Sequence, residues 1–92
     1  MNTCNFLVCY DISDKKRLAK IARLLSKIAI RIQKSIFLYL DCNKIEISKL
    51  VDELNLIIND KEDDIRIYRI DINQSINLNS GIDLKNPNII KE

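Results

Sequence analysis

The chain has 92 residues, 47% of them hydrophobic, and a net charge of +2. This length predicts one domain with a small core, for which association with another subunit is a reasonable expectation. The sequence lacks histidine, which excludes imidazole bases and zinc sites built on that residue. Three cysteines without paired spacing, Cys4, Cys9 and Cys42, predict free thiols in a reducing cytoplasm. No apolar run has the length of a signal segment or a membrane span, so no membrane partner is expected.

Charge is distributed unevenly along the chain. Residues 1–40 contain eight bases and two acids, whereas residues 41–92 contain seven bases and eleven acids. No acid occurs between Lys15 and Leu40. Because protein surfaces usually mix both signs of charge, this asymmetry predicts a polyanion-binding face in the first half of the chain.

The first predicted elements are a buried strand and an amphipathic helix. Residues 5–12 form a compact run rich in apolar, aromatic and β-branched side chains, which is typical of a strand. Ser13 and Asp14 are of the type that caps helix N-termini, and apolar residues then recur at helical spacing over residues 15–29. A soluble surface is the ordinary explanation for bases on such a helix, but we expect four of them to contact nucleic acid: Lys16, Lys20, Arg23 and Lys27.

Residues 30–40 alternate, which predicts either one long strand or two short strands separated near residues 33–35. We expect the isoleucine and leucine side chains of this segment to face the helices. The opposite face of the sheet is then expected to show Arg31, Gln33, Phe37, Tyr39, Arg66 and Tyr68. Its aromatic content predicts that a partner subunit covers it.

A second helix is expected after Asn43, which stands at capping-box spacing from Glu46. Its apolar face comprises Ile47, Leu50, Val51, Leu54, Ile57 and Ile58. An alternating segment at residues 64–71 predicts another strand.

The remaining chain is polar, with a weak strand expected through Ile76 and Leu78 and a short apolar patch at residues 89–90. The order of elements predicts an α+β fold, a ferredoxin-like α/β sandwich (βαββαβ). It forms a single domain over residues 1–92, in which residues 76–92 are a C-terminal tail.

Asp11 stands at the carboxyl end of the first strand, just before the basic helix. A capping or turn acid is the ordinary explanation for such a residue. The alternative is a ligand for a hard cation such as magnesium, which binds one or two carboxylates together with phosphate oxygens and water. Ser35 has no histidine or evident lysine base beside it, so it is a poor candidate for a nucleophile.

Three segments resemble a known family. "YDISDKKRLAKIARLL", followed by "IRIQKSIF", and the later "DDIRIYRI" are similar to motifs of the CRISPR-associated endoribonuclease family, the small adaptation protein Cas2. The resemblance implies a ferredoxin-like homodimer in which a C-terminal strand, here at residues 89–90, pairs with the sheet of the partner subunit. It also implies metal-dependent cleavage of RNA or DNA, and a dimer that bridges two dimers of the Cas1 integrase and holds duplex DNA.

The resemblance further implies a magnesium site at Asp11, with one such residue from each subunit near the dimer axis. By motif match, the candidates for the cleavage site or its support are Asp11, Tyr10, Arg17, Arg31, Ser35 and Phe37. Gln33 is expected to be structural.

Two residues depart from the family's pattern. Ala29 stands where the family usually has glycine; if that glycine has a positive φ, alanine would be strained there and the helix end would be rearranged. Leu38 stands where an acid is frequent. Two other hypotheses therefore stand beside the endonuclease: a DNA-binding scaffold for the integrase without cleavage, and a toxin-type ribonuclease resembling virulence-associated protein D.

Overall fold

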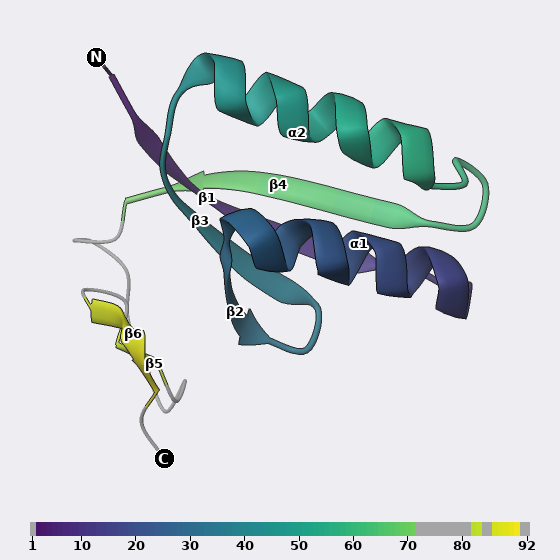
Figure 1. Cartoon of the computed structure of the whole chain (residues 1–92), viewed down its shortest axis with the longest axis horizontal. Helices are drawn as coiled ribbons and strands as arrows, with labels where there is room; N and C mark the ends of the chain where they lie inside the picture. The colour runs from purple at the N-terminus through teal and green to yellow at the C-terminus, as the bar shows by residue number, and fades with distance from the viewer. Residues whose placement is uncertain (1, 72–81, 84–85, 91–92) are drawn as a thin grey trace.

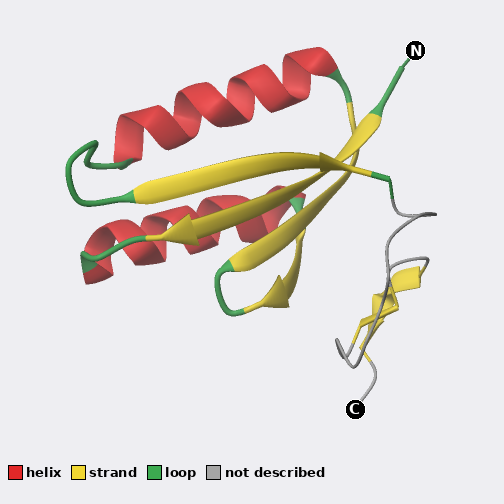
Figure 2. Cartoon of the chain, turned by 180° about the vertical axis from the view of Figure 1, so that it is seen from behind, coloured by secondary structure: helices red, strands yellow, loops and turns green. Residues whose placement is uncertain are grey.

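The computed structural model describes residues 2–71, 82–83 and 86–90. Its elements are β1 (Cys4–Asp11), α1 (Lys15–Ile28), β2 (Ile30–Gln33), β3 (Ile36–Cys42), α2 (Lys44–Ile57), β4 (Asp64–Ile70), β5 (Ile82–Asp83) and β6 (Asn86–Ile90). Four strands form an antiparallel sheet in the order β2-β3-β1-β4. Both helices pack on one face of this sheet (Figure 1), and Figure 2 shows the arrangement from behind. This order confirms the predicted ferredoxin-like α/β sandwich.

Both helices begin at the predicted capping residues. The Asp14 carboxylate accepts a hydrogen bond from the Arg17 amide at 3.0 Å. The side chains and backbones of Asn43 and Glu46 form the reciprocal bonds of a capping box. Ala29 has φ −136° and ψ 169°, which is ordinary extended backbone, and its amide donates to the Leu25 carbonyl at 2.8 Å. The strain expected at this alanine is therefore absent, and α1 ends without rearrangement.

The prediction of which β3 side chains face the helices was wrong. Phe37 and Tyr39 lie in the core with the helix residues Ile21, Leu25, Leu50 and Leu54, and Phe37 exposes none of its surface. Phe37 is in register with Val8 and Arg31, so Arg31 also lies on the helix side, at the sheet edge. The faces were misassigned because β3 carries apolar side chains on both of them. The alternation of side chains along the strand then does not show which face packs on the helices.

The opposite face carries a row of cross-strand partners: Ile30, Leu38, Leu7 and Tyr68. Leu38 exposes none of its surface, whereas Tyr68 is 48% exposed. Arg66 and Tyr68 thus lie on this face as predicted, and Val51, which was expected in the core, is 38% exposed.

The C-terminal predictions are only partly covered by the described residues. The expected strand through Ile76 and Leu78 lies outside them. Residues 89–90 belong to β6, which pairs with β5 of the same chain through Ile82 and Ile90. Pairing of this segment with a partner subunit stays a prediction. No helix in the described part of the chain is long and apolar enough to cross a membrane.

Candidate functional site

Asp11 is the last residue of β1 and is exposed to solvent. It stands opposite Asp64, the first residue of β4, in the antiparallel register. Among the described residues its carboxylate has no hydrogen-bond or ion-pair partner, and Asp14, not Asp11, caps α1. The explanation of Asp11 as a capping acid is therefore wrong, and its carboxylate is available to a ligand.

A shallow open depression of about 290 Å³ lies beside Asp11. Its lining residues are Cys9, Tyr10, Asp11, Ser35, Ile36, Asp64 and Arg66. The Asp64 carboxylate accepts from the Arg66 guanidinium at 2.9 Å, which partly compensates its charge. Two carboxylates opposite one another repel, and a cation between them would relieve that repulsion. Over the described residues no three metal-ligating side chains converge, so one chain supplies at most part of a coordination shell here.

Tyr10 and Phe37 belong to the core beneath this depression. Tyr10 is 5% exposed, and its hydroxyl donates to the Lys34 carbonyl at 3.3 Å. Its ring stacks on that of Phe37, with centroids 6.1 Å apart. The Tyr10 amide also donates to the Ser35 carbonyl at 3.0 Å. These two predicted site residues therefore support the turn that carries Ser35, and their side chains are covered rather than presented to a substrate.

Arg31 is bound to the β2–β3 turn. Its Nε and Nη2 atoms donate to the Lys34 carbonyl at 3.2 and 2.7 Å. Its guanidinium carbon lies 5.5 Å from the centre of the Phe37 ring, within the range of a cation–π contact. Arg31 thus clamps the turn that places Ser35 at the depression.

Arg17 is bound by acids of the α2–β4 turn. Its Nε lies 2.7 Å from Asp63 Oδ2, and its Nη2 lies 3.5 Å from a Glu62 carboxylate oxygen. The hydrogen bond from Arg17 lowers the pKa of Asp63 from 3.8 to about 2. Asp63 was not among the predicted site residues, although it is the acid that opens the Asp-x-Ile-Arg-Ile-Tyr segment.

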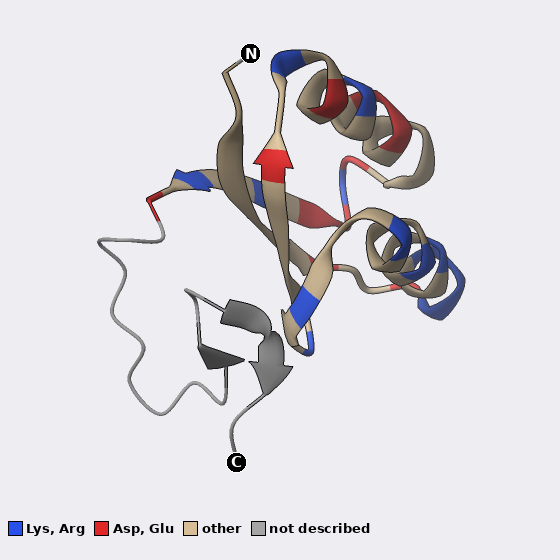
Figure 3. Ribbon diagram, turned by 60° about the vertical axis from the view of Figure 1, so that its left-hand side comes forward, with Lys and Arg blue, Asp and Glu red and all other residues tan. Residues whose placement is uncertain are grey.

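The four predicted nucleic-acid contacts, Lys16, Lys20, Arg23 and Lys27, are all exposed on α1. None of them forms an ion pair with a described residue. Figure 3 shows that bases line α1, whereas α2 carries both signs of charge. We call the four side chains the basic face of α1.

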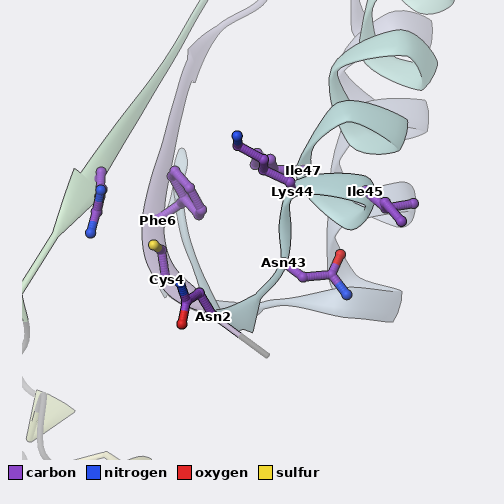
Figure 4. Close-up of a pocket in the computed structure, with 8 residues that line it drawn as sticks. Asn2, Cys4, Phe6, Asn43, Lys44, Ile45 and Ile47 are labelled. Carbon is purple, nitrogen blue, oxygen red and sulfur yellow. The ribbon is translucent and has the colours of Figure 1, made fainter.

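A larger pocket of about 460 Å³ lies between the start of α2 and the sheet. Figure 4 shows Phe6 projecting from β1 toward the first residues of α2, with Cys4 and Asn43 nearby. None of the predicted site residues lines this pocket. Of the predicted site residues, Tyr10, Asp11 and Ser35 line the depression beside Asp11 instead.

Residues 4–77 match the family described as CRISPR associated protein Cas2. The chain is 34% identical over 64 residues to CRISPR-associated endoribonuclease Cas2 1 of Nitrosomonas europaea, a match that covers 70% of this chain and 60% of that protein. It is 35% identical over 71 residues to CRISPR-associated endoribonuclease Cas2 2 of Thermodesulfovibrio yellowstonii, covering 77% of each. The chain thus spans less than two thirds of the length of the Nitrosomonas protein.

Solved structures agree with the sequence match. Streptococcus pyogenes Cas2 superposes with a TM-score of 0.69 at 31% identity, covering 75% of this chain and 88% of that one. A chain of a partial Cas6-RT-Cas1–Cas2 complex superposes with a TM-score of 0.73 at 30% identity, covering 91% of this chain and 88% of that one. Motifs, strand order and these matches together place the chain in the Cas2 family of CRISPR-associated proteins.

Proposed function

We propose that this chain is a metal-dependent endonuclease that cleaves RNA or DNA phosphodiesters and acts, as a homodimer, with the Cas1 integrase in CRISPR adaptation. Its relatives carry the name endoribonuclease, and one similar chain belongs to a complex that contains Cas1. The observation that carries the proposal is the exposed Asp11 carboxylate, which has no partner among the described residues and lies at a depression next to Asp64.

The residues at this depression fit a magnesium ion held partly by the protein. Asp11 would be the main ligand, from each subunit of a dimer, and the neighbouring carboxylate of Asp64 adds negative charge. Magnesium commonly binds one or two carboxylates and completes its shell with water and phosphate oxygens. When bound, the ion would supply polarisation of the phosphodiester and activation of a water molecule.

The chain's own side chains would bind the nucleic acid and hold the site in shape. The basic face of α1 attracts phosphates without reading sequence, which suits duplex DNA and single-stranded RNA alike. Arg31 and Tyr10 bind the Lys34 carbonyl and so hold the turn that brings Ser35 to the depression, where its hydroxyl would donate to a phosphate oxygen.

A second candidate is a scaffold that binds DNA and Cas1 without cleaving in the cell. It is favoured because four proposed catalytic residues are not presented to a substrate. Tyr10 and Phe37 are buried, and Arg17 and Arg31 are bound within the protein. The family match favours both CRISPR functions over the toxin-type ribonuclease. A Cas1 gene and a repeat array beside this gene would support the same choice.

The proposal is tested with Asp11→Asn, cleavage being measured with magnesium and with a chelator. A neutral amide is a poor ligand for a hard cation, so cleavage is expected to be lost while the fold is kept. Without metal, the variant should be as stable as the native protein or slightly more stable, because repulsion with Asp64 is removed. Asp14→Asn is the matched control: asparagine caps as well as aspartate, so cleavage should be retained. Full cleavage by Asp11→Asn would remove Asp11 from the site and refute the proposed magnesium ligand, whereas a native protein that does not cleave with magnesium would leave only the scaffold.

A further inference from the structure

The carboxylate of Asp63 lies at the centre of a hydrogen-bond cluster that joins two loops. Its Oδ1 atom accepts from the Ser13 amide at 3.3 Å, from the Ser13 hydroxyl at 3.5 Å and from Arg17 Nη2 at 3.2 Å. Its Oδ2 atom accepts from Arg17 Nε at 2.7 Å and from the Asn59 amide at 2.9 Å. The Asp63 side chain exposes none of its surface. Such a covered and fully hydrogen-bonded carboxylate holds its neighbours in one geometry.

Two partners of Asp63 follow Asp11 along the chain, and Asp63 itself precedes the residue that stands opposite Asp11. Ser13 follows Asp11 by two residues, and Arg17 lies in the first turn of α1. On the other strand, Asp64 follows Asp63 directly and stands opposite Asp11 in register. The cluster therefore fixes the path of the chain immediately after Asp11 and the start of the basic helix against the same end of the sheet.

Arg17 is already paired with carboxylates of its own chain. Its Nε and Nη2 atoms donate to Asp63, and Nη2 also lies within ion-pair distance of Glu62. Only 22% of its side-chain surface is exposed. A guanidinium compensated by two carboxylates attracts a third anion weakly, because its charge is already balanced locally.

We infer that Asp63 is a positioning residue for the site at Asp11, and that Arg17 acts through Asp63 rather than on the nucleic acid. This inference rests on the proposed function for its effect on cleavage, but the geometry that it assigns is independent of cleavage. Residues that orient a metal ligand typically change activity by about 10- to 100-fold when they are replaced.

The first arm of the test is a double-mutant cycle on cleavage with Arg17→Ala, Asp63→Asn and the double variant. If Arg17 works through Asp63, each single variant lowers kcat about 10- to 100-fold and the double variant is no worse than the poorer single one. Independent, multiplying losses would overturn the inference. Asp60→Asn is the matched control, since it removes one exposed acid from the same turn without touching Arg17, and it should keep native kcat.

The second arm uses Arg17→Lys to separate the two roles of the arginine. Lysine binds phosphate well as a point charge but does not reproduce the bidentate contact of arginine with a carboxylate. The lysine variant should therefore lose nearly as much kcat as Arg17→Ala. Recovery of native kcat would assign Arg17 to the substrate and overturn the inference.

The third arm does not depend on cleavage. Hydrogen exchange at the Ser13 amide should become faster in both Arg17→Ala and Asp63→Asn, whereas exchange in the middle of α2 should not change. The dependence of duplex-DNA affinity on salt should keep its slope in Arg17→Ala, while Lys20→Ala should flatten it by about one counterion. Unchanged exchange at Ser13, or a flattened slope in Arg17→Ala, would overturn the inference. If the native protein does not cleave, the proposed nuclease activity is refuted. Hydrogen exchange at Ser13 and the salt dependence of DNA binding then decide whether Asp63 positions Ser13 and Arg17.

Discussion

Replacing Phe37 tests whether this residue is a core side chain or takes part in cleavage. The ring exposes none of its surface, stacks on Tyr10 and lies under the Arg31 guanidinium. Phe37→Ala removes the buried ring and is expected to cost about 3–5 kcal/mol. That is a large part of the roughly 5–15 kcal/mol that stabilises a domain, so loss of activity in this variant would report unfolding.

Phe37→Leu is the variant that separates the two explanations. It keeps most of the apolar volume and loses mainly the contact between the rings, so a cost of about 1–3 kcal/mol is expected. Unfolding in urea gives the stability, and cleavage is measured well below the unfolding transition. We expect the folded variant to cleave within a few-fold of the native protein. A stable Phe37→Leu protein without cleavage would refute the assignment of Phe37 to the core alone.

Three further results are expected. Arg17 lowers the pKa of Asp63 from 3.8 to about 2, so the unfolded chain protonates this carboxylate at a higher pH than the folded chain does. The free energy of unfolding, measured in urea, should therefore fall as the pH drops from about 4 to about 2. Asp63→Asn should flatten this dependence on pH. Reversing Lys20 and Arg23 to glutamate should weaken binding of all duplex sequences alike and flatten its salt dependence; unaltered affinity would make the basic face of α1 an ordinary solvated surface. Truncation before Asn88 should raise the dissociation constant of the homodimer in sedimentation, and an unchanged constant would count against strand exchange.

The helices could be predicted from sequence because each has one apolar face and a defined start. Asp14 and Asn43 cap their helices as expected, since a cap involves residues only three positions apart. The break between β2 and β3 was left open by periodicity, and the structure places it at Lys34 and Ser35. Local signals therefore gave the order of elements, and that order was sufficient for the fold class.

A site residue could be predicted only where its place in the chain was enough to locate it in the fold. Asp11 was expected at the carboxyl end of a strand, and it lies there. The roles of Arg17 and Arg31 could not be predicted, because a motif gives no information about the partner of a long side chain. Arg17 binds Asp63, which is 46 residues further along the chain, and only the pairing of β1 with β4 brings the two together.

The sheet face opposite the helices, as the structure assigns it, lies next to the expected metal site and is also the expected dimer interface. Cys9, Ile36 and Arg66 line the depression beside Asp11 and lie on the same face of the sheet as Leu7, Leu38 and Tyr68, two residues away along each strand. A second copy that covers this apolar face would therefore also approach Asp11. Homodimer formation and cleavage are then expected to fail together.

Tyr68→Asp tests this coupling, since Tyr68 is 48% exposed and can carry a charge without opening the core. A charge buried at an interface is unfavourable, so the variant should be monomeric in sedimentation, and its cleavage should rise with protein concentration as association is restored by mass action. Leu56→Asp is the matched control: Leu56 is 87% exposed on α2, in the other layer, so dimer and cleavage should both be retained. A monomeric Tyr68→Asp protein with the native magnesium dependence would separate the metal site from the dimer, because each chain would then complete its coordination shell with water and substrate oxygens alone.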